Sequence, residues 1–145
     1  MATWDDVVGL VQIMNGSAAA DNVLTLELNG NGPSRKQQLV VSLEVSQEGV
    51  KLVKLQSPFG TIDSQNTADY LVSIFRDFGS NVFGGLGFVS DDSGDSGTIT
   101  LTSTIPLALL DLSDPRPFFS YLLLFAKLAD YYEQQIFGPD APNMF

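Results

Sequence analysis

The 145 residues of the chain include no histidine and no cysteine, which leaves carboxylates and hydroxyls as the main groups available for chemistry. Histidine is the commonest general base and metal ligand, and cysteine supplies thiolate nucleophiles and disulfides. Their absence removes most hydrolase and metalloenzyme templates. Acid chemistry remains, since 17 Asp and Glu residues against 7 Lys and Arg residues give a formal net charge of −10.

The densest group of carboxylates is the segment 90–97, SDDSGDSG, which contains Asp91, Asp92 and Asp95. Clustered oxygen ligands suit hard cations such as Ca²⁺. The segment lacks the alternating ligand positions and the distal Glu of an EF-hand loop, so its pattern favours the solvated tip of a hairpin. We therefore predict no metal site in this segment.

The glycine-rich stretch 84–87, GGLG, is a second candidate for chemistry. A phosphate-binding P-loop needs a Lys followed by Ser or Thr, and a dinucleotide-binding turn needs the full G-x-G-x-x-G between a strand and a helix. Here the glycines lead into Phe88 and a predicted strand. The stretch is interpreted as a bend at the start of a hairpin.

Catalysis by paired carboxylates needs two acids held about 5 to 9 Å apart in a partly dry cleft. The acids near the predicted helices each lie at a cap, in a turn or on an exposed face, and no serine lies in a nucleophile elbow. We therefore predict that the protein is not an enzyme and that it uses no cofactor. The acids considered are Asp63, Asp69, Asp77, Asp111 and Asp114.

The first half of the chain predicts one helix and three strands. Thr3 can cap a helix over residues 4–14, with acids in its first turn and apolar residues at helical spacing. Residues 15–21 break that pattern. Alternating apolar and polar residues then predict an antiparallel meander of three strands that ends at residues 57–60, and these strands are Val23–Leu28, Leu39–Val45 and Val50–Leu55.

The second half predicts a helix, two strands and a long final helix. Asp63 or Ser64 can cap a helix that runs to Phe78. Strands follow at 86–89 and 98–105, and Pro106 makes the segment 105–112 either an edge strand or an irregular approach to the last helix. The order α-β-β-β-α-β-β-α predicts one α+β domain over residues 1–145, an antiparallel sheet with helices on one face.

The final helix, predicted over Asp114–Gly138, carries more apolar residues than one face can hold. Asp114 or Ser113 can cap it, and its first half is apolar on nearly every side. We expect Asp130 and Glu133 to face water on its second half. The apolar residues form two stripes at 100° per residue: Phe118, Leu122, Phe125, Ala129, Tyr132 and Ile136 in the first, and Tyr121, Leu124, Leu128 and Tyr131 in the second.

The second stripe of the final helix has two interpretations. It can pack under the preceding helix and complete an ordinary core, or it can contact another protein. Leaving each of these side chains in water would forgo about 1.5–3 kcal/mol, so something must cover them. A two-layer domain of this size rarely surrounds a helix, so we predict a homodimer or protein-binding surface made by Tyr121, Leu124, Leu128 and Tyr131.

The charge distribution excludes two classes of partner. Residues 63–145 carry eleven acids against three bases, which would repel nucleic-acid phosphates and anionic membrane surfaces. The longest apolar run, 118–126, is shorter than the about 20 residues that span a bilayer. The N-terminal MATWDDVV has acids where a signal peptide has bases, so we expect a cytoplasmic protein.

The element order, the acidity and the sequence of the final helix together resemble the type III secretion chaperone-like proteins. The chain is also similar to the YbjN-type bacterial proteins and to cyanobacterial and plastid relatives of that fold. The resemblance covers the whole chain, and it implies a binding module, often dimeric, that holds a segment of another protein without any catalytic residue. The residues that carry it are VLTLEL, LVVSLEV, VKLVKL and SYLLLFAKLADYYEQQIF.

These observations predict a non-enzymatic, chaperone-like protein-binding domain. A sheet edge near Leu39–Val45 or Thr98–Ile105 would accept an extended segment by strand addition. The alternatives are a structural subunit of a larger complex, a small-ligand-binding domain and an enzyme.

Overall fold

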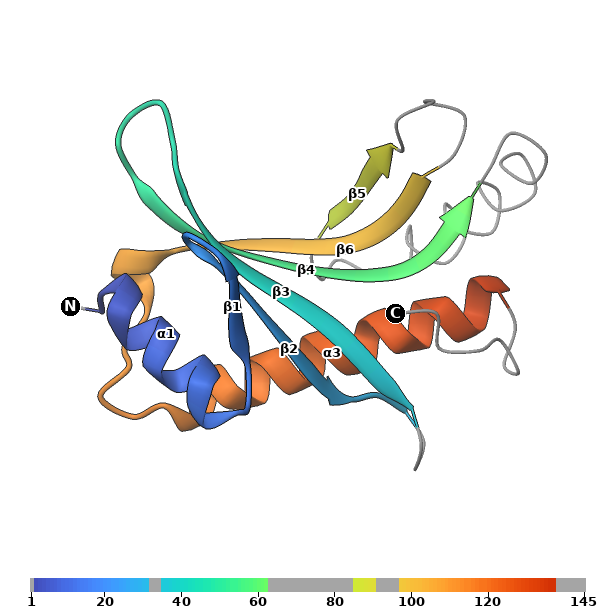
Figure 1. Ribbon diagram of the computed structural model, residues 1–145, viewed down its shortest axis with the longest axis horizontal. Coiled ribbons are helices and arrows are strands. Elements are labelled where there is room, and N and C mark those ends of the chain that lie inside the picture. The colour runs from blue at the N-terminus through green and yellow to red at the C-terminus, as the bar shows by residue number, and fades with distance from the viewer. Residues whose placement is uncertain (1, 32–34, 63–84, 91–96, 138–145) are drawn as a thin grey trace.

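The computed structural model describes residues 2–31, 35–62, 85–90 and 97–137, which form a curved antiparallel sheet with a long helix along one face (Figure 1). The predicted helix after Asp63 or Ser64 lies outside the described residues. The elements are α1 (Trp4–Ile13), β1 (Ser17–Ala20), β2 (Val23–Asn29), β3 (Lys36–Val45), β4 (Lys51–Ile62), β5 (Gly85–Ser90), β6 (Gly97–Pro106), the 3-10 turn η1 (Leu107–Leu109) and α3 (Arg116–Phe137).

The described strands form one sheet in the order β1-β2-β3-β4-β6-β5, and every neighbouring pair is antiparallel. The predicted α+β class and the meander of β2, β3 and β4 are confirmed. Strand β1 was not predicted, because its residues SAAA are small and exposed and show no alternation of apolar and polar side chains.

The meander does not end at residues 57–60, as the sequence predicted. Strand β4 continues through Pro58 and Gly60 to Ile62 and stays paired with β6, with a register shift between Pro58 and Gly60. The pairing of β4 with β3 does stop after Val40 and Gln56. Pro58 cannot donate to a ladder, so the proline ends the pairing on one side of β4 and leaves the other side intact.

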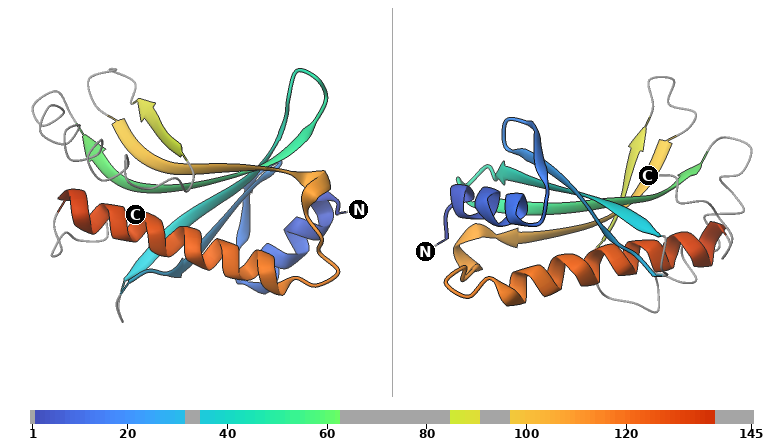
Figure 2. Two further views of the ribbon diagram at one scale, coloured as in Figure 1. Left: turned by 180° about the vertical axis from the view of Figure 1, so that it is seen from behind. Right: turned by 60° about the horizontal axis from the view of Figure 1, so that its bottom comes forward.

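The core lies between the sheet and α3. Alternate residues of β2, β3, β4 and β6 point to this face and are buried, and α3 contacts β2, β3 and β4. Helix α1 lies at the end of the sheet near the start of α3 and adds Val7 and Val11 to the core (Figure 2). The buried strand residues are Leu24, Leu26, Leu28, Leu39, Val41, Val53, Leu55, Ile99 and Leu101.

The predicted open edge at Leu39–Val45 is wrong for most of its length, because β3 lies between β2 and β4. Among the described residues, Glu44 and Val45 at its end pair with β4 alone. Strand β6 lies between β4 and β5, but β5 covers it only as far as Thr102. Among the described residues, the stretch from Ser103 to Pro106 therefore pairs on one side only. Of the predicted segment 105–112, Ile105 and Pro106 are edge strand, whereas residues 107–112 form η1 and an irregular approach to α3.

Within the ranges given above, no helix combines the length and the apolar character that crossing a membrane requires.

Candidate functional site

The N-terminal cap of α3 comes from Asp114. Its side chain accepts a hydrogen bond from the backbone N–H of Arg116 at 3.2 Å and also bonds the Arg116 guanidinium. These hydrogen bonds hold the pKa of Asp114 below its ordinary value. Asp111 accepts hydrogen bonds from the backbone and hydroxyl of Ser113, which likewise lower its pKa. Both acids have the structural roles predicted for them.

The first apolar stripe of α3 packs against the sheet and forms part of the core, as predicted. Its members are buried against the sheet, and Leu122, Phe125 and Ala129 are fully buried. Ile136 lies outside the residues whose side chains the structure describes. The remaining members are Phe118 and Tyr132.

The second stripe is divided by the structure. Tyr121 and Leu128 are partly buried and pack against the core, and the Tyr121 hydroxyl lies 2.7 Å from the Ser103 hydroxyl on β6. Leu124 and Tyr131 remain 53% and 44% exposed. The sheet therefore covers one edge of the predicted surface and leaves the other edge in solvent.

The exposed part of the stripe and the exposed Leu123 lie on the outer side of α3, and we call these three residues the α3 outer band: Leu123, Leu124 and Tyr131. Residues four and seven apart share a face of a helix, so Leu124 and Tyr131 lie in line and Leu123 borders them across the exposed Lys127. The ring of Tyr131 packs edge-on against the buried Tyr132 with a centroid distance of 5.8 Å. This contact fixes the exposed ring on a rigid support.

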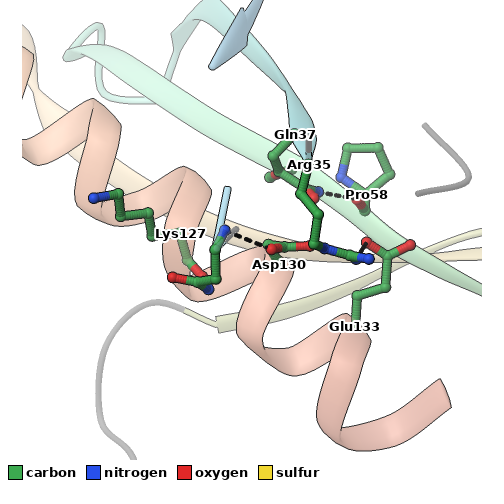
Figure 3. Close-up of polar contacts among 8 residues, drawn as sticks. Arg35, Gln37, Pro58, Lys127, Asp130 and Glu133 are labelled. Atoms are coloured by element: carbon green, nitrogen blue, oxygen red, sulfur yellow. Dashed lines mark hydrogen bonds and ion pairs between the residues drawn. The ribbon is translucent and has the colours of Figure 1, made fainter. Parts of the chain in front are cut away.

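Asp130 and Glu133 do not face water, contrary to the sequence-based expectation. Asp130 is 0% and Glu133 is 1% exposed, and both carboxylates face Arg35, which directly precedes β3 (Figure 3). The Arg35 guanidinium lies 2.6 Å from Asp130 Oδ1 and 3.3 Å from Glu133 Oε2. Its hydrogen bond to Asp130 raises the pKa of Arg35.

The segment between β2 and β3 brings further partners to Asp130. The backbone N–H of Asn31 donates to Asp130 Oδ2 at 2.7 Å, and the Asn31 side-chain amide donates to the Lys127 carbonyl at 2.7 Å. A Cβ atom added to Gly30 would lie 2.7 Å from Asp130 Oδ2, so only glycine lets the backbone approach this closely. These contacts attach the β2–β3 connection to the second half of α3.

Sequence reasoning missed this cluster, although one signal was available. At 100° per residue Glu133 falls on the same side of α3 as Leu122 and Ala126, which are both buried. The partner Arg35 comes from a segment 98 positions away from Glu133, and no pattern within the helix indicates it.

Metal binding has no support in the described parts of the chain, where no group of three or more His, Cys, Asp or Glu side chains could hold an ion. Residues 91–96 of the acidic loop lie outside the described residues. The glycines at 85 and 87 lie within strand β5 and pair with β6, so the predicted bend before the strand is wrong for these two residues.

Comparisons with known proteins add no relative: no protein-family model matches the chain, and neither the curated proteins nor the solved structures include a significant match.

Proposed function

We propose that the chain is a non-enzymatic, cytoplasmic, chaperone-like protein-binding domain that works through the α3 outer band. The observation that carries this proposal is the exposure of Leu123, Leu124 and Tyr131 on a helix whose opposite face is anchored in the core. About half of the surface of Leu124 and of Tyr131 is exposed to solvent and would be available for burial by a partner. Covering Leu124 alone would contribute about 1 kcal/mol, by the usual value for a buried leucine.

A second copy of the chain is the first partner that we propose for the band. A homodimer about a two-fold axis would pair each band with its own equivalent, which removes both from water at once. The aromatic ring of Tyr131 and the rigid helix suit such a contact, because aromatic residues are enriched in interface cores. A client protein that presents an apolar segment would use the same residues.

Sedimentation velocity across 1–100 µM protein tests the homodimer. We expect the wild type to sediment with twice the 15.6 kDa mass of the chain at the upper concentrations. The double variant Leu124→Glu, Tyr131→Glu should dissociate at least tenfold more readily, because two carboxylates would be buried without partners. Lys51→Glu is the matched control, since it changes the net charge by the same two units at an exposed position of β4, outside the band.

A photo-crosslinking amino acid at position 124 tests the client. If the band binds a client, irradiation in cells should join the chain to one or a few proteins, and these products should disappear with Tyr131→Glu. A chain that is monomeric throughout and forms no such products would remove the band as a binding surface.

A structural subunit of a larger complex is the second candidate function. It is favoured by further exposed apolar side chains away from the α3 outer band, at the end of the molecule that carries α1, the β3–β4 turn and η1. A subunit with two contact surfaces would need both to be covered. The exposed apolar side chains at this end of the molecule are Ile13, Val45, Val50 and Leu109.

A further inference from the structure

A groove of about 720 Å³ lies between α1 and the segment 110–113 that leads into α3. Its apolar lining includes Leu10, Ile13 and Leu112. Ile13 is 71% exposed, so this large apolar side chain lines the groove and is in contact with solvent. Gly9 also lines the groove, and a Cβ atom added there would meet no atom within 4 Å.

Three carboxylates line the same groove: Asp5 and Asp6 from α1, and Asp111 from the opposite wall. Among the described lining residues, none is Lys or Arg. Asp6 accepts a hydrogen bond from the Thr3 backbone and Asp111 accepts two from Ser113, so both carboxylates are oriented as well as charged. The groove therefore combines apolar walls with a charge of one sign.

We propose that this groove binds a short amphipathic segment of a partner protein, with leucine-like side chains on one face and Lys or Arg on both borders of that face. The apolar face would cover Leu10, Ile13 and Leu112, and the cations would meet the three carboxylates. Helix α1 has 10 residues, about 15 Å of length, so a helical segment of about the same size fits alongside it.

The groove's own carboxylates argue against a second copy that presents the same groove, because a two-fold contact would place Asp5, Asp6 and Asp111 opposite their own equivalents. The groove is formed by elements other than the α3 outer band, so this proposal does not depend on the proposed dimer. A basic partner segment would be attracted by the carboxylates and would lose affinity as salt screens them.

Fluorescence anisotropy with a labelled 12-residue peptide tests the proposal. The peptide carries Leu at positions i, i+3, i+4 and i+7 and Lys elsewhere, and its control carries Glu in place of every Lys. We expect the Lys peptide to bind at least tenfold more tightly than the Glu peptide. Raising NaCl from 50 to 500 mM should weaken the Lys peptide at least threefold.

Two substitutions at one position locate the binding site. Gly9→Trp directs bulk into the groove and should weaken the Lys peptide at least tenfold, whereas Gly9→Ala should change its affinity less than twofold. Asp5→Asn removes a groove carboxylate outside the α1 cap and should weaken binding about threefold. Glu27→Gln, an exposed acid of β2, should leave it unchanged.

The result is decisive in either direction. If Gly9→Trp fails to fold, as shown by circular dichroism, the comparison of Asp5→Asn with Glu27→Gln decides alone. Equal binding of the two peptides, no binding of either, or equal affinities of the Gly9 variants would overturn the proposal. A fall in the sedimenting mass of Gly9→Trp without peptide would also overturn it, because the groove would then join two copies of the chain.

Discussion

Arg35 is a single cation that pairs with two buried carboxylates, so the stability of the fold should depend strongly on it. Asp130 and Glu133 have both left water, which costs several kcal/mol for each ion unless a partner and hydrogen bonds replace the hydration. Arg35 supplies the cation, and the Asn31 backbone supplies a further donor to Asp130. We therefore expect the burial of these carboxylates to become unfavourable when Arg35 is replaced.

Arg35→Met should lower the free energy of unfolding by about 3 kcal/mol, because it removes the guanidinium that pairs with two buried carboxylates. Urea denaturation followed by circular dichroism measures this loss. Arg116→Met is the matched control: Arg116 also pairs with an aspartate, but its side chain is 85% exposed, and the change should be too small to measure. Equal losses in the two variants would contradict a buried cluster.

Between β3 and β4, side chains replace the backbone pairing that ends at Gln56. The Ser57 hydroxyl donates to the Gln38 carbonyl at 2.6 Å, and the Gln37 side-chain amide donates to the Ser57 hydroxyl at 2.9 Å and to the Pro58 carbonyl. Gln37 and Ser57 are both fully buried. The two strands thus stay connected where proline prevents a ladder.

Gln37→Leu should lower the free energy of unfolding by about 1–3 kcal/mol, because it removes a buried donor from the Pro58 carbonyl. The expected control, Gln38→Leu, changes a partly exposed side chain of the same strand and should alter stability by less than about 0.5 kcal/mol. Chemical denaturation of the two variants side by side gives the comparison. A Gln37→Leu protein as stable as the wild type would mean that these side-chain bonds do not hold the strands.

The N-terminus of α1 makes stability depend on acid pH. Thr3 and Asp6 form a reciprocal capping box, and its hydrogen bonds lower the pKa of Asp6 in the folded protein. A folded-state pKa below the unfolded value means that the stabilisation is present above about pH 4 and is lost as the pH falls through the folded pKa.

Asp6→Asn should therefore be less stable than the wild type at pH 7, and the difference should shrink as the pH falls below about 4. Urea unfolding at pH 7, 5, 4 and 3 measures both trends. Asp5→Asn keeps the capping box intact and should show the smaller difference at pH 7. A gap between Asp6→Asn and the wild type that stays constant down to pH 3 would contradict a role for the ionised carboxylate.

For the molecule as a whole, a net charge of −10 on 145 residues sets up self-repulsion in the folded state. Salt screens this repulsion over about 10 Å at 0.1 M ionic strength. Raising NaCl from 20 to 300 mM should therefore raise the thermal midpoint by a few degrees, as measured by differential scanning calorimetry. A midpoint that falls with salt would show that attractive ion pairs outweigh the repulsion.

Local patterns were enough to predict much of the fold. The period of two in β2, β3 and β4, the Thr3 cap and the apolar stripe of α3 all depend on residues close together in the chain, and the structure confirms each of them. Such patterns report which side of an element is apolar. The homodimer, the client and the chaperone-like family remain predictions.

Contacts between distant segments decided the rest. Whether Leu124 is exposed and Leu128 covered depends on how α3 lies on the sheet, which no helical pattern specifies. The burial of Asp130 depends on Arg35, 95 positions earlier in the chain, because a carboxylate leaves water only where a distant cation meets it. The sequence by itself determined the elements and their apolar faces, and only the tertiary structure decided which of those faces stay open to a partner.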